Sequence, residues 1–266
     1  MKHTRILIAC IVATTLISCN LNSGDDEEEI GSIESNVLVQ VFESHLEIGP
    51  PSVAFHFQTE DMEPCSNYDI LNEFSISGEV IVNDFEGIFR PNLCTEPGGP
   101  ATSTNFTDLQ NGEYLLEINY EENTDLYNVA ITEDSITVNA EESNFTSAPF
   151  EVSWRFPENS FALLCGTADG SSAPCDDFEG ILADSLNLQE TTFPDSGYVP
   201  YPQSTSDLGA DFEYDAPALY FIYNTRNDFE EAVTLLGEYD TEINAAASGV
   251  AIFMMNWEGE QYLIGQ

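Results

Sequence analysis

An alternation of apolar and polar residues with a period of two constrains the fold of residues 36–145 more than any other feature. Successive side chains of a β-strand point to opposite faces of a sheet, so the alternation predicts strands that bury one face. The apolar positions of the pattern are Val37, Val39, Val41, Val53, Phe55, Phe57, Tyr114, Leu116, Ile118, Tyr120, Tyr127, Val129, Ile131, Ile136 and Val138. Turn sequences such as Gly49-Pro50-Pro51 and Asn111-Gly112 separate the strands. Many short strands spaced in this way are typical of an antiparallel β-sandwich, which we predict for residues 36–145.

A short stretch within this region carries a more specific resemblance. The residues Leu109-Gln110-Asn111-Gly112-Glu113-Tyr114-Leu115-Leu116 resemble the corner that precedes a late strand in immunoglobulin-like domains, with Tyr114 as the corner tyrosine. The resemblance implies an immunoglobulin-like sandwich. It covers residues 109–116 alone, and the cysteine and tryptophan pattern of that fold is missing.

Residues 146–266 combine strand-like and helical patterns. Two apolar runs, residues 161–165 and 219–223, are each followed by a segment in which apolar residues recur with helical spacing. The helices are expected to start at Asp176 and Asn227, because each of these residues stands three positions before a Glu, close to a capping box. Strands at 249–255 and 262–264 would close the sheet. The pattern predicts a small α+β domain of ferredoxin-like kind, with two helices on one face.

The amino-terminal residues have the composition of an export signal. Lys2 and Arg5 precede an apolar run over residues 6–17 that is too short to span a bilayer. The run ends in Leu16-Ile17-Ser18-Cys19, which resembles the lipobox of bacterial lipoproteins. That resemblance implies removal of residues 1–18 as a signal peptide and attachment of acyl chains such as palmitate to Cys19. The alternative is an ordinary cleaved signal in which Cys19 is incidental.

An acidic segment follows the cysteine. Residues 19–35 contain the run Asp25-Asp26-Glu27-Glu28-Glu29 and cannot bury themselves in a core, so we read them as a lipidated tether. The segment resembles the acidic export tether of surface lipoproteins in Bacteroidetes, which implies an outer-membrane protein that faces the cell surface. A plain solvated spacer is the alternative. Asn20 stands where an aspartate would favour retention in the inner membrane.

The charge of the chain excludes several classes of partner. It has 48 acidic residues against five basic ones, and loss of Lys2 and Arg5 with the signal would change the formal net charge from −43 to −45. Only Arg90, Arg155 and Arg226 would then remain to neutralise phosphates, so we expect no nucleic-acid partner. Contact with the membrane is expected through the lipid anchor alone, since an anionic body is repelled by an anionic surface.

Cys10 lies in the apolar run and would be removed with the signal, which leaves four cysteines after Cys19. They indicate disulfide bonds, because an even number in an exported chain is typical of oxidised pairs. Three pairings are possible. We prefer Cys65 with Cys94 and Cys165 with Cys175, because each bond then lies within one predicted domain. Zinc binding is the alternative, but the sequence contains no CxxC pair and no nearby set of histidines.

No sequence motif points to a particular reaction or cofactor. His45 and His56 sit in strand patterns without an evident partner, and no G-x-S-x-G elbow supports a serine hydrolase. Asp211, Glu213 and Asp215 would share one face of a strand and are suited to calcium, but a triplet of acids is expected by chance in so acidic a chain. We therefore predict no metal and no cofactor.

The best candidate for a binding surface is the loop over residues 191–210. It contains Phe193, Tyr198 and Tyr201 among prolines and glycines, and long loops on rigid scaffolds often carry function. The alternative is an ordinary connector that is packed by its aromatic residues.

These observations predict a non-enzymatic surface lipoprotein that binds a glycan, a peptide or an envelope protein. The alternative is a secreted polysaccharide hydrolase that uses a pair of the many carboxylates. A deep cleft with two acids facing each other would favour the hydrolase.

Overall fold

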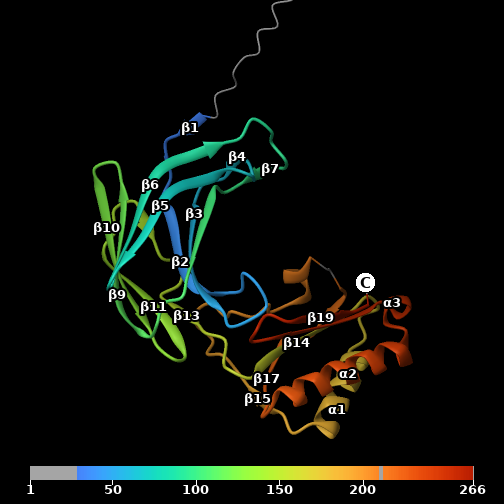
Figure 1. Ribbon diagram of the computed structural model, residues 1–266. Helices are drawn as coiled ribbons and strands as arrows, with labels where there is room; N and C mark the ends of the chain where they lie inside the picture. Colours follow the sequence, from blue (N-terminus) through green and yellow to red (C-terminus); the bar gives the residue numbers. More distant parts are fainter. Residues whose placement is uncertain (1–28, 210–211, 266) are drawn as a thin grey trace, which may run out of the picture.

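The structure is a computed structural model that describes residues 29–209 and 212–265. The chain is mainly β and forms two sheets, with two long helices packed against the second (Figure 1). The first sheet takes its strands from the amino-terminal half of the described chain, and the second takes them from residues 160–264.

The first sheet is a single curled sheet of mixed strand direction. Its hydrogen-bonded order is β12-β2-β3-β8-β5-β6-β9-β10-β11-β13, with β1 beside β6, and β4 and β7 form a separate two-stranded ribbon. The strands are β1 (Glu29–Gly31), β2 (Val37–Ser44), β3 (Ser52–Thr59), β4 (Glu63–Cys65), β5 (Asp69–Ser77), β6 (Val80–Arg90), β7 (Pro97–Gly99), β8 (Thr102–Thr107), β9 (Gly112–Tyr120), β10 (Asn123–Ile131), β11 (Ser135–Glu142), β12 (Thr146–Ser147) and β13 (Val152–Trp154). β6 pairs with β9 in parallel, as does β12 with β2, while most of the other pairs are antiparallel.

This sheet differs from the antiparallel immunoglobulin-like sandwich that the sequence predicted. Hydrogen bonds run through all of its strands, so the two separate sheets of such a sandwich are not confirmed. An alternating pattern predicts that one face of each strand is buried, but it does not indicate what covers that face. A second sheet and a curled continuation of the same sheet can bury it equally well. The Tyr114 hydroxyl does donate to the carbonyl oxygen of Gln110 at 2.8 Å, which is the contact of a corner tyrosine.

The concave side of the curled sheet holds the first hydrophobic core. The predicted faces are confirmed, because the apolar positions of the alternating pattern lie in this core or pack against it. Its largest fully buried side chains include Tyr127, Phe55 and Phe57. Burial of each such side chain contributes about 1.5–3 kcal/mol, so this core is the main source of stability for the first sheet.

The second sheet is antiparallel throughout. Its order is β15-β17-β14-β18-β19, with β16 beside β14, and every neighbouring pair runs antiparallel. The elements are β14 (Ser160–Thr167), α1 (Ala173–Ser185), β15 (Gln189–Thr191), a short 3-10 helix (Thr205–Leu208), β16 (Tyr214–Asp215), β17 (Leu219–Ile222), α2 (Arg226–Ile243), α3 (Ala245–Ser248), β18 (Val250–Asn256) and β19 (Gln261–Ile264).

Both faces of this second sheet are covered. The helices α1 and α2 lie on one face of the sheet (Figure 1). They pack there through Phe178, Phe229 and Leu236, and a smaller cluster around Phe156 and Tyr201 covers the other face. Every residue of β14 and β18 is therefore buried. The predicted strands and both long helices of this region are present, although the helix starts differ. The short β15 and β16, the 3-10 helix and α3 were not predicted.

The helix starts differ from those that were predicted. α2 begins at Arg226 rather than Asn227, and the Asp228 carboxylate, not Glu230, accepts the free backbone N–H of Thr225 at 2.9 Å. α1 begins at Ala173, three residues before the predicted start, because Pro174 is tolerated in the first turn, where its missing N–H needs no partner. No described helix is both long and apolar enough to cross a membrane.

A buried carboxylate holds the edge strand β12 in place on the first sheet. Asp125 in β10 is fully buried and accepts hydrogen bonds from the backbone N–H groups of Asn144, Phe145 and Thr146 at 2.6, 3.0 and 2.8 Å. The Thr146 hydroxyl also donates to Asp125 at 2.6 Å. These bonds fix the start of β12 beside β2. Burial by itself raises the pKa of Asp125, but the hydrogen bonds outweigh it, so the pKa lies below its ordinary value.

We expect Asp125→Asn to lower the free energy of unfolding by about 3 kcal/mol at pH 7, because an amide cannot accept all of these bonds. A carboxyl whose folded pKa is depressed contributes stability above its unfolded pKa, about 3.9, and loses that contribution as the pH falls through the folded pKa. The difference between wild type and variant should therefore shrink in urea unfolding at pH 3. The exposed Asp195→Asn is the matched control, and a difference that is equal at both pH values would contradict the role of the charge.

Candidate functional site

The two sheets meet at a buried ion pair. Glu43, near the end of β2, accepts a hydrogen bond from Arg155 Nε at 2.6 Å through one carboxylate oxygen and from the Phe156 backbone N–H at 2.8 Å through the other. The Glu43 side chain is only 2% exposed, so both oxygens must be satisfied within the protein. This arrangement attaches the segment after β13 to the first sheet.

The same arginine fixes two turns of the first sheet. Its Nη1 donates to Asn111 Oδ1 at 2.8 Å and to the carbonyl oxygen of Thr132, and its backbone N–H donates to the carbonyl oxygen of Asp134 at 3.0 Å. Asn111 lies just before β9, and Thr132 and Asp134 lie in the turn between β10 and β11. Arg155 thus holds turns that are distant in sequence in one place.

The loop over residues 45–51 makes a second contact between the two sheets. His45 Nε2 is hydrogen-bonded to the Trp257 carbonyl oxygen at 2.9 Å, and the Gly49 N–H donates to the Glu258 carbonyl oxygen at 2.8 Å. A Cβ atom at Gly259 would lie 2.8 Å from His45 Cγ, so a glycine is needed for this close approach. The loop is therefore fixed at both of its ends.

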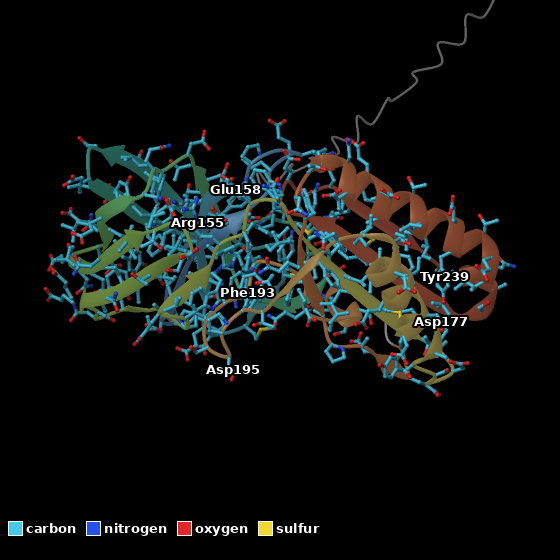
Figure 2. All side chains as sticks on the ribbon, turned by 90° about the horizontal axis from the view of Figure 1, so that it is seen from below. Arg155, Glu158, Asp177, Phe193, Asp195 and Tyr239 are labelled. Atoms are coloured by element: carbon cyan, nitrogen blue, oxygen red, sulfur yellow. A yellow bond between two sulfur atoms is a disulfide. The ribbon has the colours of Figure 1, made fainter. Side chains whose placement is uncertain are left out.

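A cleft of about 620 Å³ opens beside these contacts. It is lined by Glu43, Pro50, Pro51, Asn111, Glu133, Asp134, Arg155, Phe156, Pro157, Glu158 and Trp257. We call it the junction cleft, because residues of both sheets line it. Figure 2 shows Arg155 and Glu158 at the place where the two parts of the ribbon meet.

The charged groups that remain free in the junction cleft are negative. Glu133, Asp134 and Glu158 are exposed in it, whereas the Arg155 guanidinium is already engaged. Glu43 is engaged as well. The cleft therefore offers free carboxylate acceptors beside proline and tryptophan walls, which suits a ligand with donor groups or positive charge.

The predicted binding residues do not form an open aromatic surface. Tyr201 is buried and its hydroxyl is hydrogen-bonded to Ser160 Oγ at 2.8 Å, and burial raises its pKa. The Phe193 ring packs edge-on against Tyr220, with ring centres 4.9 Å apart. Tyr198 packs on Phe42 of the first sheet, with ring centres 5.1 Å apart.

The loop that carries these residues works mainly as a connector. Tyr198 exchanges backbone hydrogen bonds with the segment of β13, donating to the Val152 carbonyl oxygen at 2.9 Å and accepting from the Trp154 N–H at 2.8 Å. Phe193 and Asp195, labelled in Figure 2, lie close together. Both line a groove of about 250 Å³ beside β15 and β17. The aromatic residues of the loop thus connect the two sheets, and the Asp195 side chain lies at the surface.

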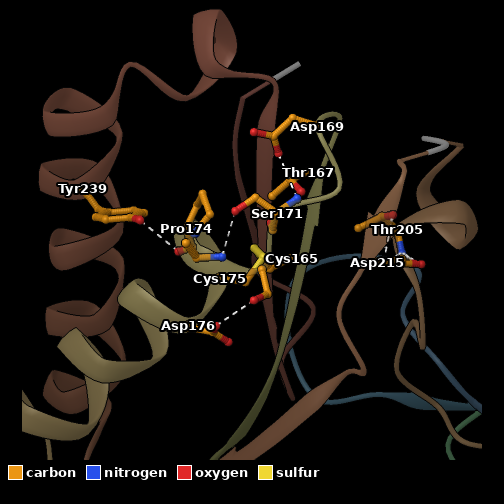
Figure 3. Close-up of a disulfide and its surroundings, with 12 residues drawn as sticks. Cys165, Thr167, Asp169, Ser171, Pro174, Cys175, Asp176, Thr205, Asp215 and Tyr239 are labelled. Carbon is orange, nitrogen blue, oxygen red and sulfur yellow. Dashed lines mark hydrogen bonds between the residues drawn. A yellow bond between two sulfur atoms is a disulfide. The ribbon is translucent and has the colours of Figure 1, made fainter.

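Both preferred cysteine pairs are joined. Cys65 in β4 pairs with Cys94, and Cys165 in β14 pairs with Cys175 in α1, with Cα atoms 5.5 and 5.7 Å apart. Figure 3 shows the second bond between the strand and the first turn of the helix. Cys165 and Cys175 are buried, so they attach α1 to the sheet and are not available as ligands.

His45 and His56 do not come together. His45 contacts the Trp257 carbonyl oxygen, whereas His56 Nδ1 is hydrogen-bonded to Thr104 Oγ1 at 2.9 Å on the outer side of the first sheet. Burial lowers the pKa of His56. Neither histidine has a carboxylate or cysteine partner among these contacts, so the geometry assigns them packing roles.

The acidic triplet considered for calcium is not assembled in the described chain. Asp211 lies outside the described residues, as do the predicted signal peptide, residues 1–18, and Cys19. Asp215 accepts hydrogen bonds from the backbone N–H and the hydroxyl of Thr205, the latter at 3.0 Å (Figure 3). Within residues 29–209 and 212–265, no group of three or more His, Cys, Asp or Glu side chains is placed to hold a metal ion.

The junction cleft was not predicted from the sequence. One signal was present: Glu43 continues the alternation of Val37, Val39 and Val41, so it occupies a buried position of its strand. A carboxylate at such a position requires a partner, and the chain has only four arginines and one lysine to provide a cation. Nothing in the sequence indicated that Glu133, Asp134 and Glu158 would face the same space.

Comparison with known proteins gives no relative. No protein-family model matches the chain, and no characterised protein or solved structure shows significant similarity to it.

We expect Glu43→Gln to lower the free energy of unfolding by about 3 kcal/mol, because it leaves the Arg155 charge unpaired at a buried contact. Urea unfolding followed by tryptophan fluorescence is a suitable measurement, since Trp154 and Trp257 lie on either side of the junction. Glu158→Gln, an exposed change in the same cleft, should alter stability by less than about 0.5 kcal/mol. Equal effects of the two variants would show that the buried pair has no special role.

Proposed function

We propose that this chain is a lipoprotein of the bacterial outer membrane, anchored by acyl chains on Cys19 and facing the cell surface. The proposal is supported by the order of features in residues 1–29: a basic start, a short apolar run, the sequence Leu16-Ile17-Ser18-Cys19 and an acidic tether. Each methylene of an acyl chain contributes about 0.8 kcal/mol of membrane binding, so two or three chains are sufficient to hold the protein.

The second unit is proposed to have ferredoxin-like topology. The support comes from the strand order β18-β14-β17-β15, with α1 between β14 and β15 and α2 between β17 and β18 in sequence. An immunoglobulin-like relationship for the first unit is supported by the Tyr114 contact alone, and the parallel pair of β6 and β9 speaks against it.

The proposed activity is non-catalytic binding of a glycan, a peptide or an envelope protein in the junction cleft. The observation that carries it is a cleft of about 620 Å³ whose walls are preformed by the contacts of Glu43, Arg155 and His45. A preformed cleft loses less conformational entropy when a ligand binds. Junctions between two packed units are also the usual place for ligand sites.

A polysaccharide hydrolase is the second candidate, because Glu133, Asp134 and Glu158 line the same cleft. A glycosidase needs one acid that is held protonated and a second that is ionised. All three of these side chains are exposed, so none of them has the buried, apolar surroundings that the acid of a glycosidase usually has. The environment therefore favours binding over hydrolysis.

We expect Cys19→Ala to move the protein from the membrane fraction to the soluble fraction of the cell envelope or the medium, because the acyl chains can no longer be attached. Immunoblots of fractionated cells measure this result, with Cys10→Ala as the control that should leave the protein membrane-bound. Membrane association of Cys19→Ala that persists after a salt wash would contradict the anchor.

We expect the full-length protein, purified in detergent, to bind members of a glycan or peptide array without converting them. The double variant Asp134→Asn/Glu158→Gln should weaken this binding about tenfold or more, since two acceptors of the cleft lose their charge. Glu238→Gln on the exposed face of α2 is the matched control. Release of reducing sugar that is abolished by a single acid-to-amide change in the cleft would establish the hydrolase instead.

A further inference from the structure

We propose that the ligand of this protein is an extended polypeptide segment that contains both basic and aliphatic residues. It would lie across the junction cleft and a second hollow on the other side of Pro50 and Pro51. The inference rests on the proposed binding function and specifies its partner.

The second hollow has a volume of about 550 Å³. It is lined by Leu46, Glu47, Ile48, Gly49, Pro50, Pro51, Ser52, Phe106, Thr107 and Asp108. Pro50 and Pro51 belong to the walls of both hollows, so the two adjoin along the loop of residues 45–51. An extended chain can pass from one hollow to the other over these prolines, whereas a compact small ligand would fill only one of them.

The loop between the hollows displays unusual apolar surface. Leu46 and Ile48 are 67% and 70% exposed, which places them among the most exposed large apolar side chains of the described chain. The loop does not collapse onto them, because the Gly49 N–H and the His45 ring hold it to the turn after β18. Exposed aliphatic side chains on a fixed loop next to a groove are typical of a protein-binding surface.

The charges along the groove favour a positively charged partner. Five exposed carboxylates line the two hollows: Glu47, Asp108, Glu133, Asp134 and Glu158. Arg155 is the one cation in either lining, and its guanidinium is used by Glu43 and Asn111. A partner with lysine or arginine side chains therefore gains electrostatic complementarity along the whole groove.

Other occupants fit these observations less well. A second copy of the chain would bring its own excess of acidic residues against the groove, because the sequence has 48 acidic residues and five basic ones. A neutral glycan would gain nothing from the carboxylates as charges, and it would leave Leu46 and Ile48 in water. A metal ion would need converging ligands, and the described residues contain no such group.

The test uses fluorescence anisotropy of the full-length protein with three labelled eight-residue peptides, composed of alternating lysine and leucine, lysine and serine, or glutamate and leucine. The lysine–leucine peptide should bind at least tenfold more tightly than either of the others. Its affinity should fall about tenfold between 50 and 500 mM NaCl, since exposed charges are screened. The double variant Leu46→Ser/Ile48→Ser should weaken it a further tenfold or more, because aliphatic burial is lost.

Matched variants separate the groove from the general acidity of the protein. Leu93 is 74% exposed but lies in neither hollow, so Leu93→Ser should leave the affinity unchanged, as should Glu238→Gln. Glu133→Gln/Asp134→Asn should weaken binding and reduce its salt dependence. Equal binding of the lysine–serine peptide, or an equal loss in the control variants, would overturn the inference.

Failure of the inference and failure of the proposed function can be distinguished. A glycan that binds in the cleft and is insensitive to Leu46→Ser/Ile48→Ser would overturn the peptide partner but retain the binding function. Dimers in sedimentation that are abolished by the same double variant would also overturn it, because the loop would then be an interface between copies. Absence of any ligand for the cleft in both arrays would remove the binding function itself.

Discussion

The contact of Glu43 with Arg155 and Phe156 is the interaction on which the arrangement of the two sheets depends. A carboxylate that is 2% exposed is stable only when both of its oxygens are bonded, and here one bond reaches a side chain and the other a backbone N–H of the segment that enters the second sheet. Movement of the segment that follows β13 away from the first sheet would leave the Glu43 carboxylate without its partners. The walls of the junction cleft are therefore fixed by the same bonds, which connects the stability of the fold to the proposed site.

Much of the fold could be predicted because it depends on local patterns. The alternation around Val37, Val53 and Leu116 predicts which face of each strand is buried. The helical spacing around Phe178 and Phe229 predicts which face of each helix packs against the sheet. The order of the strands depends on pairing between distant segments. Alternation carries no information about this pairing, so neither the parallel pair of β6 and β9 nor the continuous curl of the first sheet was predictable.

The candidate site was harder to predict than the fold. The composition of the loop favoured Phe193, Tyr198 and Tyr201 as binding residues. Their side chains instead contact residues of β17, β2 and β14, because large aromatic side chains gain more from burial than from exposure. The residues that do line the cleft are common surface types. Glu133, Asp134 and Glu158 differ from the other acids of the chain only in where the fold places them.

The engagement of Arg155 has a consequence for cleavage by proteases. Trypsin-like proteases recognise an arginine by enclosing its guanidinium, and they cut the bond that follows it. The bond between Arg155 and Phe156 links the two halves of the body, and here the guanidinium is turned inward onto Glu43, Asn111 and Thr132. Separation of the halves by such an enzyme would require the junction to open first, so the closed junction protects the linker from cleavage.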